Sequence, residues 1–346
     1  MSDKMKRRIC FLMSMMLTFL CLSGCKAETQ KVVYTVYPVG YILQELGGDK
    51  IQTESIQTDT IVQRAQIRDD YMDVLDGVEL FLYIGALEPY MQIYNPEIRS
   101  KVTTLDLSAK SSIYQFKRYT RIFIDDVEEY IIADYYRDDV MKTIDVNDKD
   151  LHLWTDPIAM VSMAREIKEW LQANHIEESN YFENHFHRLE SELIRLDAEY
   201  QSLSTKLKKE NKTVKFVSMT ASFGNWQRTY GFQVYPVILS KYGSLPSFEQ
   251  LEVIKKRIIE DEVKYIAYEP NMTEDMIALF NQLETELGLT RVYLSNLSSI
   301  NDTQKEQNMD YLSIMYENLS TLENMASDNV TESDEIIEEL NKEEDE

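Results

Sequence analysis

Residues 177–210 read EESNYFENHFHRLESELIRLDAEYQSLSTKLKKE. Apolar side chains recur in this stretch at alternating steps of four and three residues, at Phe182, Phe186, Leu189, Leu193, Leu196, Tyr200, Leu203 and Leu207. This spacing predicts a helix with one continuous apolar seam. At 1.5 Å per residue the helix is about 50 Å long, enough to run along two lobes. A coiled-coil oligomerisation helix is the alternative, ranked second because flanking α/β segments can cover the seam within one chain.

The segments on both sides of this helix alternate between strand and helix patterns. Four short apolar runs have the length and composition of buried strands, at residues 32–36, 78–84, 214–219 and 263–268. A helical pattern follows the first run and ends at Gly47-Gly48, since glycine commonly terminates helices. Such alternation favours parallel sheets covered by helices. The predicted fold class is therefore α/β, with two lobes that each hold a mostly parallel sheet, joined by one long linking helix.

The N-terminus has the layout of an export signal. Lys4, Lys6, Arg7 and Arg8 precede an apolar run over residues 9–22, which is short for a membrane span of about 20 residues. Leu22-Ser23-Gly24-Cys25 resembles the lipobox of bacterial lipoproteins, whose cysteine receives a diacylglycerol. We predict a signal peptide over residues 1–24 and lipidation of Cys25, which would anchor the chain to a membrane. A retained transmembrane helix and an ordinary cleavage site are the alternatives.

Composition excludes several classes of protein. The 346 residues carry 36 Lys and Arg against 60 Asp and Glu, a formal net charge of −24, which argues against nucleic acid as a partner. The 3 cysteines, at positions 10, 21 and 25, all lie at or before the predicted lipidation point. Thiol catalysis and thiolate metal sites are therefore excluded from the mature chain. Residues 323–346 hold eleven acids and one lysine, and we predict a disordered acidic tail there.

Five short motifs occur in an order that resembles a known family. They are Val36-Tyr37-Pro38, Leu151-His152-Leu153-Trp154-Thr155-Asp156-Pro157, Ala221-Ser222-Phe223-Gly224, Tyr268-Glu269-Pro270, and the stretch from Asp310-Tyr311-Leu312 to Glu317-Asn318-Leu319. Together with the lipobox and the linking helix, they resemble the TroA-like zinc and manganese solute-binding lipoproteins of ABC transporters. The resemblance implies a non-enzymatic protein whose two rigid lobes hold a metal ion and deliver it to a membrane permease. The sequence also offers no nucleophile–base pair and no phosphate-binding glycine loop.

Members of that family hold the ion with four side chains, mostly His with an Asp or Glu. The resemblance, carried over position by position, gives Gln63 in place of the first-lobe histidine and His152 as the second ligand. Thr220 stands at the third position, and the fourth falls on Asn296 or Ser298. Only His152 is a strong ligand, so we predict a degenerate site that binds zinc weakly or not at all.

Other polar residues are weaker candidates. Glu269 could supply a carboxylate to a harder cation such as manganese, or the cleft could take an already chelated ligand, but a supporting role for Glu269 is the simpler interpretation. Residues 125–150 hold ten acids against three bases and could gather divalent cations, although a solvated loop or face is more ordinary. His175, His185 and His187 are predicted to lie at the surface.

The sequence predicts an organisation into a signal peptide (1–24), a lipidated linker (25–31), an N-terminal lobe (32–158), connecting helices (159–212), a C-terminal lobe (213–322) and a tail (323–346). The leading hypothesis is a lipid-anchored, extracytoplasmic solute-binding protein of a zinc- or manganese-type ABC importer, with a permease as partner. The alternative is a non-transport adhesion or interaction module that has lost metal binding. One stiff linking helix also predicts little hinge bending.

Overall fold

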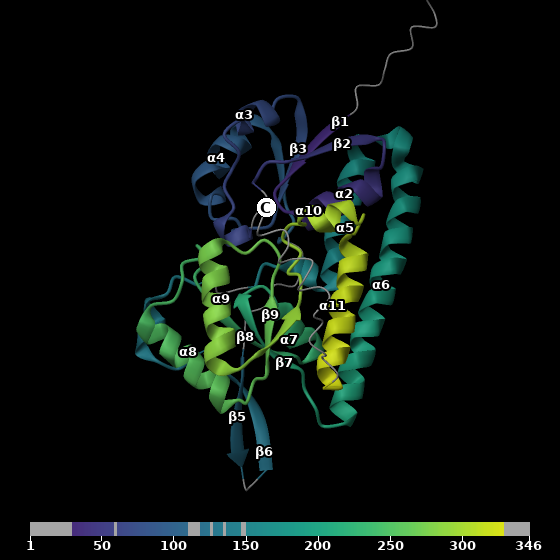
Figure 1. The fold of residues 1–346 in the computed structure, drawn as a ribbon. Coiled ribbons are helices and arrows are strands. Elements are labelled where there is room, and N and C mark those ends of the chain that lie inside the picture. The colour runs from purple at the N-terminus through teal and green to yellow at the C-terminus, as the bar shows by residue number, and fades with distance from the viewer. Residues whose placement is uncertain are drawn as a thin grey trace, which may run out of the picture.

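The N-terminal lobe is built on a parallel four-stranded sheet with the strand order β2-β1-β3-β4 (Figure 1). The computed structural model describes residues 30–58, 61–109, 118–124, 127–133, 136–146 and 150–328. The elements of this lobe are β1 (Gln30–Tyr34), α2 (Tyr37–Gly47), β2 (Ile51–Ser55), the short 3-10 helix η1 (Val62–Arg64), α3 (Tyr71–Val74), β3 (Val78–Tyr83), α4 (Met91–Lys101) and β4 (Thr103–Asp106). The central strands β1 and β3 bury consecutive apolar residues, as expected of strands covered on both faces.

The C-terminal lobe repeats this plan with a second parallel sheet, in the order β10-β9-β7-β8. Its elements are β7 (Lys215–Thr220), α7 (Gly224–Tyr230), β8 (Gln233–Ile238), α8 (Phe248–Glu260), β9 (Tyr265–Tyr268), α9 (Glu274–Leu287), β10 (Thr290–Tyr293), α10 (Asp302–Glu306) and α11 (Tyr311–Ala326). A capping box of Ser247 and Gln250 begins α8. The two parallel sheets and their helices confirm the predicted fold class.

Two helices connect the lobes, α5 (Pro157–Asn174) and α6 (Ser179–Lys209). The Asp156 side chain accepts hydrogen bonds from the backbone of Ile158 and Ala159, and Pro157 occupies the first helical position, so α5 begins at a defined residue. All eight apolar residues of the predicted seam are buried along α6. That helix contacts α2 in the N-terminal lobe and α7 and α11 in the C-terminal lobe (Figure 1), which confirms the prediction of one long linking helix.

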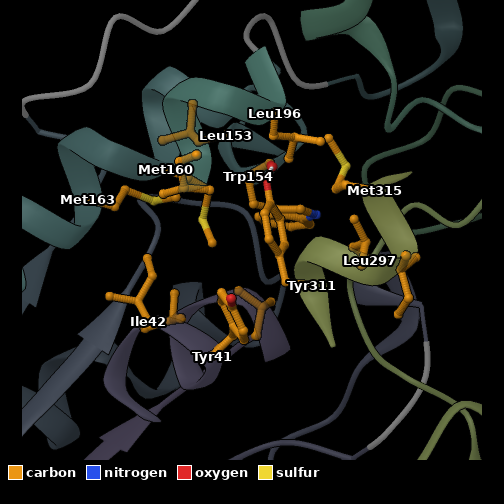
Figure 2. Packing of buried hydrophobic residues seen from close by; sticks show 14 of the residues in the cluster. Tyr41, Ile42, Leu153, Trp154, Met160, Met163, Leu196, Leu297, Tyr311 and Met315 are labelled. Atoms are coloured by element: carbon orange, nitrogen blue, oxygen red, sulfur yellow. Dashed lines mark hydrogen bonds between the residues drawn. The ribbon is translucent and has the colours of Figure 1, made fainter. Parts of the chain in front are cut away.

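Trp154 joins the lobes at the centre of the core. It lies in the short 3-10 helix η3 (Leu153–Thr155), its indole Nε1 donates to the carbonyl of Asn296 at 2.7 Å, and its own carbonyl accepts from the Tyr311 hydroxyl at 2.6 Å. Tyr311 in turn stacks on Tyr41 of α2 with ring centroids 5.4 Å apart, and Figure 2 shows these three rings together between α2 and α11. One apolar cluster therefore contains residues of both sheets.

Several element ends differ from the sequence predictions. β1 begins at Gln30, two residues before the predicted start of the lobe. α11 continues to Ala326 with Met325 buried, so the prediction of a disordered tail from residue 323 is wrong for its first four residues, which complete an amphipathic helix. The remaining tail from 329, the predicted signal peptide and Cys25 lie outside the described residues. None of the helices in the described ranges has the length and apolar character needed to span a bilayer.

The acidic segment before His152 is not simply a loop. Strands β5 (Arg118–Ile124) and β6 (Val127–Ala133) pair antiparallel, and the short 3-10 helix η2 (Asp139–Thr143) follows. The hairpin projects from the C-terminal lobe on the side of β8 (Figure 1). β-branched and aromatic residues interleave with the charges over residues 118–133, and their strand propensity outweighs the acidic composition.

Leu193 tests the apolar seam of α6. Its side chain is fully buried, whereas the neighbouring Ile194 is 51% exposed on the same helix. We expect Leu193→Ala to lower the free energy of unfolding by about 2–5 kcal/mol through lost burial and a residual cavity. Ile194→Ala removes the same number of atoms from an exposed position and should have a small effect. Urea denaturation followed by tryptophan fluorescence measures both, and equal effects would contradict the assignment of the seam.

Glu88 is a second buried group with a measurable consequence. It follows β3, is fully buried, and neither carboxyl oxygen meets a hydrogen-bond partner of ordinary geometry within the described part of the chain. The hydroxyl of Thr35, directly after β1, also has no partner of ordinary geometry among the described residues, but its proximity opposes the rise in the pKa of Glu88. Burial raises the pKa of Glu88 to about 7 from its ordinary 4.5. The native state therefore retains a proton that the unfolded chain has already released between these two pH values.

We expect the free energy of unfolding to fall as the pH rises from 4.5 through 7, because ionisation of Glu88 is favoured only in the unfolded state. The total loss from this group is about 3 kcal/mol at most, from 1.36 kcal/mol per pKa unit. Glu88→Gln mimics the protonated acid, so the stability of the wild type relative to this variant should decline across the same range. Denaturation curves at pH 5, 6, 7 and 8 measure the difference, and a constant difference would refute the assignment.

Candidate functional site

The residues predicted to form the site meet between the lobes, at the carboxyl ends of the parallel strands. Gln63 lies on η1 and His152 in the corner before η3, while Thr220 ends β7 and Glu269 directly follows β9. Asn296 lies in the loop after β10. All are buried except Gln63, which is partly exposed. The carboxyl edges of parallel strands are where open α/β sheets bind ligands, and the predicted positions do come together there.

The imidazole of His152 is held in one orientation by Asp150. One carboxyl oxygen, Oδ1, accepts from the backbone N–H of His152 at 3.0 Å and lies 2.7 Å from its Nδ1. The other oxygen accepts from the backbone N–H of Asn225 at 3.0 Å. Because this carboxylate accepts, we assign the ring proton to Nδ1, which leaves the lone pair of Nε2 facing the space between the lobes. A carboxylate behind an imidazole is the usual support of a metal-ligating histidine.

Nε2 of His152 already has two polar neighbours. It lies 3.3 Å from Nε2 of Gln63 and 3.1 Å from the hydroxyl oxygen of Ser222. That hydroxyl also lies 2.7 Å from Oγ1 of Thr220. The amide oxygen of Gln63 is buried without a hydrogen-bond partner among the described residues. The imidazole of His152 therefore connects the linking corner with polar side chains of both lobes.

Glu269 is surrounded by donors. Its Oε1 accepts from the backbone N–H of Thr220 at 2.8 Å, and its Oε2 accepts from the Thr220 hydroxyl and from Nδ2 of Asn296 at 2.8 Å. The amide orientation of Asn296 is set because its oxygen accepts from the backbone and hydroxyl of Ser298. Desolvation raises the pKa of Glu269, and the hydrogen bonds from Thr220 and Asn296 oppose that shift. Both carboxyl oxygens of Glu269 thus already accept hydrogen bonds from the protein.

The donor set does not match a strong zinc site. It contains one imidazole nitrogen, one capped carboxylate and several neutral hydroxyl and amide oxygens, whereas zinc is usually bound by at least three strong protein ligands. No group of three or more His, Cys, Asp or Glu side chains in the described ranges is placed to hold a metal ion. The order Asp150, His152, Ser222 matches the hydrogen bonding of a hydrolase triad, but Ser222 is fully buried, so no substrate reaches its hydroxyl.

Sequence reasoning missed two members of the site. Ser222 links His152 to Thr220, and Asp150 orients the histidine. Both lie two residues from a predicted site residue, and the quoted Ala221-Ser222-Phe223-Gly224 motif already contained Ser222. Asp150 was counted only within an acidic run. Ser298, the alternative to Asn296 at the fourth position, donates from its hydroxyl to Oδ1 of Asn296 at 2.8 Å.

The remaining histidines lie on the linking helices. His187 is exposed, as predicted, and His185 is partly buried with its Nδ1 2.7 Å from the carbonyl of Glu45. The surface prediction is wrong for His175, which is 5% exposed. Its ring packs edge-on against Trp170 and Phe182, so apolar packing at the end of α5 outweighs the polarity of the ring.

Comparison with known proteins identifies relatives along most of the chain. The family model described as "ZnuA: Zinc-uptake complex component A periplasmic" matches residues 32–325. The zinc-binding lipoprotein AdcA of Streptococcus pneumoniae is 24% identical over 173 residues, which cover 50% of this chain and 33% of that protein. The high-affinity zinc uptake system protein ZnuA of Bacillus subtilis is 23% identical over 173 residues, 50% of this chain and 52% of that protein. The match thus spans about a third to a half of these curated relatives.

Solved structures share the fold. The periplasmic zinc-binding protein TroA from Treponema pallidum superimposes with a TM-score of 0.66 at 16% identity, covering 85% of this chain and 98% of that one. The laminin-binding adhesin Lmb from Streptococcus agalactiae gives a TM-score of 0.67 at 19% identity, covering 86% of this chain and 99% of that one. At this level of identity the likeness concerns the fold alone.

The hydrogen bonds around Asp150 make a direct prediction. Asp150→Asn replaces one acceptor oxygen by an NH₂ donor that must face an N–H group, so we expect a loss of about 2–4 kcal/mol in the free energy of unfolding. Asp139→Asn is the control, because Asp139 is an exposed residue of η2 paired only with Lys142 in the described contacts; its unfolding midpoint should not change. Urea denaturation measures both variants, and an unchanged midpoint for Asp150→Asn would contradict its anchoring role.

Proposed function

The chain belongs to the family of the periplasmic zinc-uptake component ZnuA, and from this premise we propose that it serves as the extracytoplasmic solute-binding component of a zinc- or manganese-type ABC importer. The family consists of non-enzymatic solute-binding proteins. The observation that carries the proposal is the imidazole of His152, which Asp150 fixes at Nδ1 so that Nε2 faces the junction of the lobes. A single oriented imidazole between two lobes is suited to holding an ion as cargo.

The proposed cargo site is degenerate. His152 is the one strong ligand, Gln63 could turn its unpaired amide oxygen toward an ion, and Thr220 or Ser222 could add a hydroxyl. Glu269 and Asn296 are bonded to each other and support the site rather than ligate. Because the site offers one imidazole and neutral oxygens, its zinc affinity should be far below that of a site with three strong ligands. The site also lacks the free carboxylates that manganese prefers.

We further propose that the chain acts at a membrane surface. A diacylglyceryl group on Cys25 would hold it there, with the lobes beginning a few residues later, and a permease in the same membrane would receive the cargo. This proposal retains the predicted signal peptide over residues 1–24 and the extracytoplasmic location. The name of the Streptococcus pneumoniae relative, zinc-binding lipoprotein AdcA, supports it.

A second function class has its own support. The polar atoms around His152 and Glu269 are already paired with one another, as expected if the fold has been kept while ion binding was lost. The protein would then be a surface interaction module. The fold is shared with a laminin-binding adhesin, but that likeness concerns the fold alone and does not identify a binding partner here.

Calorimetric titration with Zn²⁺ and Mn²⁺ tests the cargo proposal. We expect weak zinc binding that His152→Ala lowers at least about tenfold, equivalent to 1.4 kcal/mol. His187→Ala is the matched control, because that ring is exposed on α6 and its loss should not change the affinity. Gln63→His places a second imidazole beside Nε2 of His152 and should raise zinc affinity by more than about tenfold.

Two results would contradict the cargo proposal. Zinc binding that survives in His152→Ala would place the ion elsewhere. The absence of detectable binding of either metal to the wild type, combined with no gain in Gln63→His, would favour the interaction module.

A further inference from the structure

Arg64 follows Gln63 on η1 and reaches across to the C-terminal lobe. Its Nε and Nη2 donate to the carbonyl of Gly243 at 3.0 and 2.8 Å, in the loop after β8. Its Nη1 and Nη2 donate to the two carboxyl oxygens of Asp275, in the first turn of α9, at 3.0 and 2.8 Å. We infer that this contact is a latch that holds the two lobes together without a bound ion.

The receiving side of the latch is shaped for the guanidinium group. Gly243 has a positive φ of 66°, and a Cβ added there would lie 2.9 Å from Cγ of Arg64, so only glycine admits the arginine at this distance. Thr273 bonds the same carboxylate and orients it. Hydrogen bonds from Arg64 and Thr273 hold the pKa of Asp275 below its usual range. A planar guanidinium that binds a carboxylate with two bonds and a carbonyl with two more cannot be replaced by lysine without loss.

An isolated surface ion pair would be weak support, since exposed pairs contribute little. Arg64 is only 28% exposed along its side chain, however. Of its five hydrogen bonds to the opposite lobe, two go to the carbonyl of Gly243 and one to the hydroxyl of Thr273 rather than to a charge. Salt does not screen those bonds as it screens a charge pair. The geometry thus resembles a small interface more than a single salt bridge.

The latch is accompanied by direct contacts on the other side of His152. The backbone N–H of Tyr37 donates to the carbonyl of Ser298 at 3.3 Å, and Trp154 donates to the carbonyl of Asn296. Protein groups therefore bridge the lobes on both sides of the site. A ligand shifts a conformational equilibrium only by its difference in affinity for the two states. If protein contacts alone hold the lobes together, ion binding has little closure left to drive.

Hydrogen–deuterium exchange and small-angle X-ray scattering on the full chain test this inference. The amides of Arg64 and Gly243 donate to Ile61 and Ser240 within their own short segments. These segments lose their contact with each other when the latch opens, so we expect local opening and amide exchange in them to become more frequent. In metal-free buffer, Arg64→Ala should raise exchange over residues 61–66 and 240–246 at least about threefold, and Arg64→Lys should have an intermediate effect. Addition of Zn²⁺ should change neither the exchange of these segments in the wild type nor the radius of gyration of the wild-type protein.

Arg68→Ala is the matched control. Arg68 also makes a forked set of bonds, to Asp70, Glu54 and the carbonyl of Ser55, but all within the N-terminal lobe. A zinc-induced compaction of the wild type would overturn the inference, as would an Arg64→Ala variant that exchanges like the wild type or like Arg68→Ala. The exchange measurements in metal-free buffer test the latch independently of zinc binding. A zinc titration that detects no binding would therefore not contradict this inference.

Discussion

The buried carboxylate of Asp150 is the constraint on which the junction of the lobes depends. A carboxylate that is buried away from water needs hydrogen-bond donors for both oxygens, because burying a polar group without a partner costs free energy. Those donors come from His152 in the linking corner and from the backbone of Asn225 at the start of α7. One side chain therefore fixes the corner that leads into α5 and docks it on the second lobe. The direction of the imidazole, and the position of Ser222 beside it, follow from that requirement.

Hydrogen-bond spacing describes how the polar side chains lie at the junction of the lobes. The neighbouring polar atoms from Gln63 through His152 and Ser222 to Thr220 lie 3.3, 3.1 and 2.7 Å apart. Ligands of a tetrahedral zinc ion with bonds of about 2.1 Å are roughly 3.4 Å apart. The spacing of these atoms is thus slightly tighter than that of ligands around a zinc ion. An ion can enter only if a side chain moves, and Gln63 is the least buried of these four.

Much of the fold could be predicted from the sequence, because its signals are local. The spacing of Leu189 and Leu193 along α6 is a helical period, and Asp156 with Pro157 marks a helix start wherever they occur. The positions of Gln63, His152 and Thr220 followed from short motifs. Arg64 and Asp275 carried no such signal, since they are 211 residues apart and each looks like an ordinary surface charge. His175 was misplaced for the converse reason, because its burial depends on rings that only tertiary packing brings around it.

The shared helix α6 also determines how the two lobes unfold. Its seam belongs to a single apolar cluster that includes Leu80 of one sheet and Phe216 of the other. If the helix detaches, each sheet loses the cover that this cluster provides, although two other apolar clusters, one mainly in each lobe, do not involve α6. Unfolding of one lobe therefore exposes part of the other at the same moment. The two lobes therefore form one cooperative unit despite their separate sheets. We therefore expect a protease that cuts α6 not to release two folded halves, and a truncation that removes the C-terminal lobe to expose the N-terminal residues of the shared cluster.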